Sequence, residues 1–381
     1  MKINLTIKSS VLITLLNISM CLAQGGNNKG TILYYTNFKK GIPLTDFANP
    51  GQWVPAKGGI TSTSTGLKNY LMLFRQYSLN KRMVSVRVSM GKDTRFNFFT
   101  VEMDNFHMWG TLIQADVANC ILKVFANYNA DSAAYPQVLS IHPYKFIAGH
   151  DYTLSMLRDN NAKKFIITDH ETGKIDTVTR TYGTDGGLIR DGFAIATESG
   201  TPPIVKSFTV STAYPKNLRV LYMGDSITEG LYSVPDAFSQ HGQAGISGRS
   251  SGNVYGAQNR VLSELAILRP KYVSILIGTN NGNSIANLTN LCQSILKLGI
   301  TPILNNLPWK YNGSVVEDNR IIAEVRKSLG LKGAAFDVAT SINGLNQQQD
   351  KSIFPDGVHP NAIGIQLMYR QLQKDVSDLF E

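Results

Sequence analysis

The stretch Leu-Arg-Val-Leu-Tyr-Met-Gly-Asp-Ser-Ile-Thr-Glu-Gly, residues 218–230, decides the fold predicted for the second half of this chain. Its apolar run at 220–223 ends at Gly224, the pattern of a short buried strand stopped by a turn. Asp225 and Ser226 would then follow the carboxyl end of that strand, where open α/β sheets bind ligands. These residues alone leave two interpretations open: a serine nucleophile with a base in reach, or a turn that caps the next helix.

The sequence after this stretch alternates between helical and strand-like patterns. Apolar residues at helical spacing predict helices over 253–268, 284–298, 314–329 and 361–379. Short apolar runs predict further strands over 272–277, 300–305 and 334–338. Strands that are apolar throughout and alternate with helices are typical of a parallel sheet covered on both faces. Residues 217–381 are therefore expected to form one three-layer α/β domain.

The first half has a different pattern, made of short segments separated by turn signals. Residues 84–90 alternate between apolar side chains (three valines and Met90) and polar ones, and no long helical period occurs between 31 and 214. We therefore expect an all-β sandwich over 31–214. Its layout resembles a concanavalin A-like jelly roll. Trp53, Phe106 and Trp109 could form a sugar-stacking surface there or belong to the core.

The N-terminus has the features of an export signal. Lys2 and Lys8 precede an apolar run at 11–20 that is too short to span a bilayer, and small residues precede a cut after Ala23. Residues 1–23 are thus expected to be a signal peptide and 24–30 a flexible leader. Alternatively, residues 18–21 resemble a bacterial lipobox with Cys21 lipidated, although Met20 is larger than that motif usually allows. We expect a secreted, periplasmic or cell-surface protein without a membrane span.

Composition limits the partners of this chain. Its 381 residues, 43% of them hydrophobic, are enough for two cores. The net charge of +10 comes from scattered Lys and Arg without a long basic run, which favours a solvated basic surface over nucleic-acid binding. Cys120 and Cys292 fall in different predicted domains and are expected to be two buried, unpaired thiols. No metal-ligand spacing occurs, so no metal and no cofactor are expected.

A serine nucleophile requires a base, and the second half contains only His241 and His359. Asp356 lies three residues before His359 in a loop rich in Gly and Pro, so it could hold one side of the imidazole while the other faces a serine. The alternative is a helix-capping loop with an exposed histidine. His241 is the rival base, but it has no nearby Asp and fits a substrate loop better.

The second half resembles the SGNH (GDSL-type) hydrolases. The segments 224–226, 245–250, 277–281 and 356–359 match the four blocks of that family in order. The resemblance implies Ser226 as nucleophile, His359 as base and Asp356 as its orienting partner. It also implies an oxyanion hole formed by the N–H groups of Ser226 and Gly248 and the side chain of Asn280. Where the family usually has Asp after the asparagine, this chain has Asn281, from which we expect a local hydrogen-bond change.

These observations predict a secreted serine esterase, with removal of acetyl groups from a carbohydrate as the expected reaction. The carbohydrate part is an analogy from the attached β-sandwich. Asp225, Arg249 and His241 are candidates for substrate contacts. The absence of a GxSxG elbow around Ser226 argues against an α/β-hydrolase. Two alternatives remain: a lipase or thioesterase that prefers long acyl chains, and a glycan-binding protein with a vestigial hydrolase domain.

Overall fold

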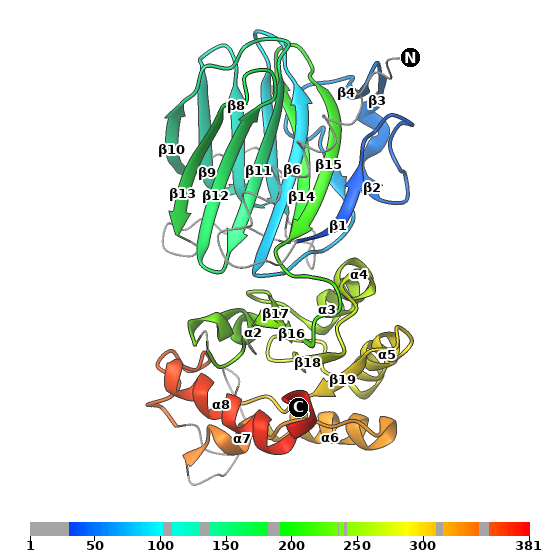
Figure 1. Ribbon diagram of the computed structural model, residues 1–381, viewed down its shortest axis with the longest axis vertical. Coiled ribbons are helices and arrows are strands. Elements are labelled where there is room, and N and C mark those ends of the chain that lie inside the picture. The colour runs from blue at the N-terminus through cyan, green and yellow to red at the C-terminus, as the bar shows by residue number, and fades with distance from the viewer. Residues whose placement is uncertain are drawn as a thin grey trace, which may run out of the picture.

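The computed structural model describes residues 30–101, 109–129, 137–181, 191–234, 236–239, 242–309, 315–342 and 350–381. An antiparallel β-sandwich forms the N-terminal half and an α/β unit forms the C-terminal half (Figure 1). The expected signal peptide with Cys21, most of the expected leader, Phe106 and the rival base His241 lie outside the described residues.

Two antiparallel sheets form the sandwich, as the alternating pattern predicted. The first sheet has the order β13 (Ile175–Thr181), β12 (Ala162–Asp169), β11 (Asp151–Asp159), β6 (Lys81–Ser89), β15 (Ile204–Thr212), β4 (Gly59–Ser62) and β3 (Trp53–Ala56), with β1 (Thr31–Thr36) paired to β15. The second has the order β10 (Gln137–Pro143), β9 (Ile121–Asn129), β8 (Trp109–Asp116), β7 (Arg95–Val101), β14 (Gly192–Ser199), β5 (Leu71–Leu73) and β2 (Phe47–Ala48). A short 3-10 turn, η1 (Pro50–Gln52), precedes β3.

The sandwich core lies between these sheets. Val84, Val86 and Val88 of β6 are fully buried, because successive residues of a strand face opposite sides. Trp53 is only 4% exposed, so the sugar-stacking interpretation is wrong for this residue. The side chain of Trp109 is not among those described.

The C-terminal unit is built on a parallel sheet with the order β17 (Ala244–Gly248), β16 (Val220–Gly224), β18 (Tyr272–Leu276) and β19 (Thr301–Leu304). In this register Gly224 lies opposite both Gly248 and Leu276. The carboxyl ends of the three strands are therefore level, and the loops that follow them meet at one edge of the sheet.

Helices cover this sheet, and their ends follow the sequence signals. The helical elements are α2 (Ser226–Glu229), η2 (Gly230–Ser233), α3 (Val254–Arg260), a π-helical turn η4 (Val261–Leu265), α4 (Ala266–Leu268), α5 (Ile285–Leu296), α6 (Val316–Leu329), α7 (Phe336–Ala339), α8 (Ala362–Asp375) and η6 (Ser377–Leu379). Ser284 caps α5 by accepting a hydrogen bond from Asn287 N, and Gly330 ends α6 with φ 65°.

The strand predicted over 334–338 is wrong. The chain makes single hydrogen bonds to the segment after β19, from Ala334 N to Asn305 Oδ1 and from Asn306 N to Ala334 O. It then turns into α7 at Phe336. A short apolar run can form either a buried strand or a buried helical turn, and here its last residues form the helical turn α7.

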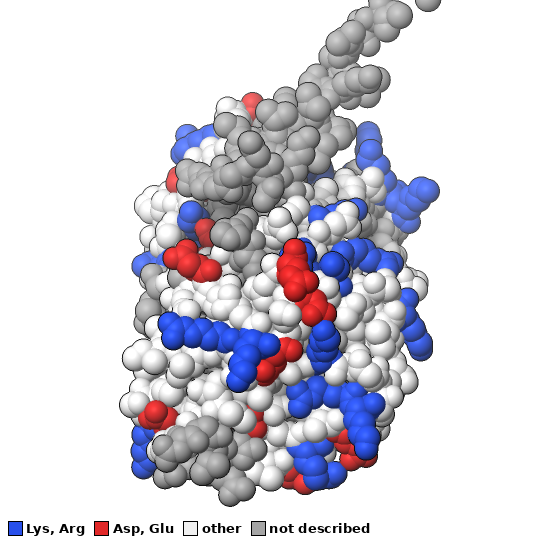
Figure 2. All heavy atoms as spheres, turned by 60° about the horizontal axis from the view of Figure 1, so that its bottom comes forward, with Lys and Arg blue, Asp and Glu red and all other residues white. Residues whose placement is uncertain are grey.

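The remaining sequence expectations concern surface and thiols. Cys292 is a buried free thiol, as expected, whereas the free thiol of Cys120 is exposed because it lies in the turn after β8. On the face shown in Figure 2, Lys and Arg are dispersed among Asp, Glu and uncharged residues. Among the described residues, no helix has the length and apolar character needed to cross a membrane.

Candidate active site

Ser226 is the first residue of α2, two residues after the end of β16. Asp225 is the N-cap of this helix, and its Oδ1 accepts a hydrogen bond from Ile227 N at 3.0 Å. The turn requires a glycine before it, since a Cβ on Gly224 would lie 2.0 Å from Leu276 O. The backbone thus places the hydroxyl of Ser226 at the carboxyl edge of the sheet, where it is partly exposed.

The loop before α8 brings a histidine to this serine. His359 Nε2 lies 2.8 Å from Ser226 Oγ, and His359 Nδ1 lies 2.6 Å from Asp356 Oδ2. The other carboxylate oxygen of Asp356 accepts hydrogen bonds from the backbone N–H groups of Val358 and His359. Partial burial opposes ionisation of Asp356, but the hydrogen bonds from His359 and Val358 prevail and lower its pKa to about 2. Asp356 is therefore an anion at every pH at which a histidine base is neutral.

Asn361 anchors this loop to the start of α8. Its side chain accepts a hydrogen bond from Gly364 N at 3.1 Å and donates one to Ser352 O at 2.8 Å. The catalytic candidates nevertheless face solvent, because the side chains of His359 and Asp356 are 47% and 55% exposed. A large substrate can therefore approach them from outside.

The two expected oxyanion residues lie on the neighbouring strand ends. Gly248 ends β17, and a Cβ there would lie 2.1 Å from Glu229 N, so only glycine fits against the end of α2. Asn280 follows β18, and its Nδ2 donates a hydrogen bond to Gly252 O at 2.8 Å. An amide nitrogen has two hydrogens, so this bond orients the side chain and leaves a second donor. Asn281, the departure from the family pattern, is exposed on the same loop.

Two of the expected substrate contacts are wrong. Asp225 is 0% exposed and Arg249 only 4%, so neither side chain reaches the surface. Burial raises the pKa of Asp225 to about 6, against the opposing hydrogen bond from Ile227 N. The guanidinium of Arg249 forms an ion pair with Asp191 of the sandwich, at 2.7 Å. Asp225 instead caps α2, and Arg249 instead forms a buried ion pair with the sandwich.

Arg260 was not identified from the sequence; its guanidinium donates hydrogen bonds to the ends of both β16 and β17. Its Nη1 donates to Ser247 O at 2.7 Å, and its Nη2 donates to Gly224 O at 2.9 Å. It is fully buried, as is Glu264 one turn later. The signal was present, because these opposite charges stand four residues apart within the predicted amphipathic helix 253–268.

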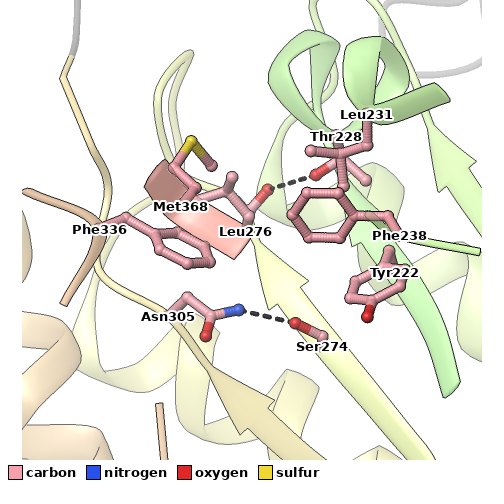
Figure 3. Close-up of a pocket in the computed structure, with 9 residues that line it drawn as sticks. All are labelled: Tyr222, Thr228, Leu231, Phe238, Ser274, Leu276, Asn305, Phe336 and Met368. Atoms are coloured by element: carbon pink, nitrogen blue, oxygen red, sulfur yellow. Dashed lines mark hydrogen bonds between the residues drawn. The ribbon is translucent and has the colours of Figure 1, made fainter. Parts of the chain in front are cut away.

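A small cavity lies among buried side chains of the α/β unit (Figure 3). Its walls come from strands β16 and β18, from the helical elements α2, η2, α7 and α8, and from the loops that contain Phe238 and Asn305. The lining residues are Tyr222, Thr228, Leu231, Phe238, Ser274, Leu276, Asn305, Phe336 and Met368. Thr228 Oγ1 donates to Leu276 O across one side, and Asn305 Nδ2 donates to Ser274 Oγ across another. Ser226, Gly248, Asn280 and His359 are not among its walls.

A serine, a histidine and a carboxylate in hydrogen-bonded sequence at the edge of a parallel sheet are the arrangement of serine hydrolases. Residues 222–367 match the model of the GDSL-like lipase/acylhydrolase family, so this part of the chain is a GDSL-like domain. The protein is accordingly a hydrolase of the esterase class.

Solved structures with similarity to parts of the chain include a lipase, an esterase and a lectin. A GDSL-like lipase from Bacteroides thetaiotaomicron is 21% identical over 42% of this chain and 88% of its own, with a TM-score of 0.37. A variant of an acetyl xylan esterase from Geobacillus stearothermophilus is 16% identical over 42% of this chain and 94% of its own, with a TM-score of 0.37. Peanut lectin with a bound 9mer peptide is 12% identical over 48% of this chain and 97% of its own, with a TM-score of 0.34. No curated protein matches the chain.

Proposed function

We propose that this protein hydrolyses acyl esters of a carbohydrate, with acetyl as the preferred acyl group, through Ser226, His359 and Asp356. The observation that carries the proposal is the chain of two contacts, 2.8 Å from Ser226 Oγ to His359 Nε2 and 2.6 Å from His359 Nδ1 to Asp356 Oδ2. This geometry lets the imidazole take the hydroxyl proton while the carboxylate holds its tautomer.

In the proposed mechanism, His359 accepts the proton of Ser226 as the serine oxygen attacks the ester carbonyl. The N–H groups of Ser226 and Gly248 and the free amide hydrogen of Asn280 stabilise the oxyanion, each donor by about 3 kcal/mol. His359 then gives its proton to the leaving hydroxyl of the sugar. Water attacks the acyl-enzyme by the same route and releases the acid and Ser226.

The rim of the site favours a sugar over a lipid. The segment 250–253 (Ser-Ser-Gly-Asn), which follows Gly248 and Arg249, and the segment 279–284 (Thr-Asn-Asn-Gly-Asn-Ser), which contains Asn280, have no apolar side chain. Hydroxyl and amide groups can exchange hydrogen bonds with sugar hydroxyls, whereas an acyl chain would leave them without partners.

Tyr255 adds an aromatic face to this rim. Its side chain is 59% exposed at the start of α3. Asn287 Nδ2 donates to its hydroxyl at 3.3 Å, and a Cβ on Gly282 would lie 3.3 Å from its ring, so the ring is held against the Asn280 loop. An exposed, oriented tyrosine can stack on the apolar face of a sugar ring.

A short acyl group suits the surroundings of Ser226. The cavity of Figure 3 is small and lined by buried side chains of the core, and none of Ser226, Gly248, Asn280 and His359 lines it. A long acyl chain would therefore have to lie along the polar rim, where its burial is less favourable than in an apolar pocket. The signal sequence expected at 1–23 leads us to propose a secreted or cell-surface enzyme, which N-terminal sequencing of the exported protein would test.

The test is hydrolysis of p-nitrophenyl acetate and p-nitrophenyl octanoate by the wild type, Ser226→Ala and the control Ser233→Ala, whose serine is exposed just after α2. We expect acetate to be preferred, no turnover by Ser226→Ala and unchanged turnover by Ser233→Ala. Preference for octanoate would favour the lipase alternative. Retention of a glycan without any ester turnover, unchanged in Ser226→Ala, would favour the binding-protein alternative. Release of acetate from acetylated polysaccharides would then identify the sugar.

A further inference from the structure

The sandwich contacts the α/β domain along the strand that ends at Gly248. Residues 76–80, between β5 and β6, run antiparallel to β17. Leu79 pairs with Ser247, and Asn80 N donates to Ile246 O at 2.9 Å. Because β17 is an edge strand of the parallel sheet, the sandwich covers hydrogen-bonding groups that the α/β domain alone would leave open.

Ser247, the residue before Gly248, is linked to the sandwich through the buried side chain of Glu264. Ser247 Oγ donates to Glu264 Oε2 at 2.5 Å, and the other oxygen of Glu264 accepts the backbone N–H of Ser78. Glu264 lies in the π-helical turn η4, within the stretch of helix that faces this interface. Arg260 Nη1 adds a donor to Ser247 Oγ at 3.0 Å.

The residue after Gly248 is held by a second route. Arg249 Nε lies 2.7 Å from Asp191 Oδ2, and the two side chains are only 5% and 2% exposed. Asp191 is itself fixed within the sandwich, since its side chain accepts a hydrogen bond from Gln76 Nε2 and its backbone oxygen accepts one from Tyr77 N. The backbone N–H of Arg249 donates to Asp225 O at 3.2 Å, next to the nucleophile.

A third set of contacts fixes α2, against which Gly248 packs. Arg158 Nη2 of β11 lies 2.5 Å from Glu229 Oε1, and Asn80 Nδ2 donates to Glu229 O at 3.0 Å. Glu229 is thus held by side chains of the sandwich, and the two neighbours of Gly248 are held to the sandwich through Glu264 and Asp191.

From this arrangement we infer that Asp191 is a positioning residue for catalysis: through Arg249 it fixes the peptide of Gly248 so that its N–H points at the developing oxyanion. The inference rests on the proposed role of Gly248. A buried charge pair has few alternative geometries, and small misplacements of a donor reduce turnover strongly. The sandwich is then part of the catalytic unit, in addition to any part it has in binding glycan.

The first test is Asp191→Asn, assayed with p-nitrophenyl acetate well below the unfolding temperature. We expect kcat to fall roughly 10- to 100-fold, with KM changed less than about 2-fold, because the donor acts mainly in the transition state. The matched control is Asp116→Asn, which removes a carboxylate charge that is equally buried and paired with Arg95 at 2.9 Å but lies in β8 of the sandwich. Circular dichroism and thermal unfolding compare the folded fraction of each preparation independently of the active site.

The second test is the double variant Asp191→Leu, Arg249→Met, which replaces the ion pair by apolar groups and avoids an unpaired buried charge. If the pair acts on Gly248, this variant folds and its kcat stays low. Wild-type kcat in the double variant, or in folded Asp191→Asn, would overturn the inference. An inactive wild type, or activity that survives Ser226→Ala, would instead overturn the proposed function. If Asp191→Asn does not fold, the double variant decides.

Discussion

The two halves of the candidate site are built in opposite ways. The acid–base half, Asp356 and His359, stands on one exposed loop, where the two residues are three positions apart. The oxyanion half around Gly248 is buried among charged and polar groups from distant parts of the chain. Local sequence is enough to bring Asp356 and His359 together, whereas the position of Gly248 depends on contacts between the two domains. Substitutions in the first half should thus affect chemistry alone, and those in the second should affect chemistry and folding together.

The largest expected effect tests the exposed half. His359→Ala removes the base, so kcat on p-nitrophenyl acetate should fall roughly 10⁴-fold or more. Because the ring is 47% exposed, the melting temperature should change little. Steady-state kinetics and thermal unfolding measure both quantities, with His142→Ala in the sandwich, paired to Asp176 at 3.3 Å, as the control. A residual rate within tenfold of the wild type would show that His359 is not the base.

Gly248→Ala tests the buried half. The added Cβ would lie 2.1 Å from Glu229 N, and the backbone has to move to accept it. We expect kcat to fall roughly 10²- to 10³-fold and the melting temperature to drop as well. Gly230→Ala is the control, since nothing lies within 4 Å of a Cβ there. Loss of activity with an unchanged melting temperature would contradict the contrast between the halves.

A smaller effect is expected on the rim. Tyr255→Ala should raise KM for an acetylated oligosaccharide about 5- to 10-fold, which corresponds to about 1 kcal/mol of lost stacking. Turnover of p-nitrophenyl acetate should stay unchanged, because that substrate has no sugar ring. Leu262→Ala, also on the helical segment and 71% exposed, is the control. An equal loss on both substrates would place Tyr255 in the acyl or catalytic part of the site.

The last prediction concerns stability rather than turnover, and its size depends on pH. The pKa of Asp225 is raised from 3.8 to about 6, so the folded state binds its proton more tightly than the unfolded state does. This carboxyl therefore contributes most to stability below pH 3.8, and its contribution falls by about 3 kcal/mol as the pH rises to 6. Asp225→Asn should melt above the wild type at pH 7.5 and close to it at pH 4. A melting difference that is the same at both pH values would contradict the raised pKa.

The sequence was sufficient where the determinants are local. The strand stopped by Gly224, the spacing of Asp356 and His359, and the caps at Ser284 and Gly330 each depend on neighbouring residues. The sandwich and the parallel sheet followed from the change of hydrophobic period, because that period sets which face is buried.

Long-range contacts account for what the sequence did not predict. Arg249 looked like a substrate contact because it follows Gly248, but its partner Asp191 is 58 positions away in the other domain. The segment 334–338 looked like a strand, yet Asn305 takes its first hydrogen bond and the chain turns into helix. Burial of Asp225 likewise follows from packing that local sequence does not record.

The cover that residues 76–80 provide for β17 has a consequence for how the chain is made. A ribosome releases the sandwich first, so that segment is in place before Ile246 and Ser247 emerge. The newly made β17 then pairs with a segment that is already folded, so this edge of the sheet is covered as soon as it forms. A circularly permuted chain that starts at residue 217 would lose this order, and its yield of soluble protein during synthesis should fall below that of the natural order.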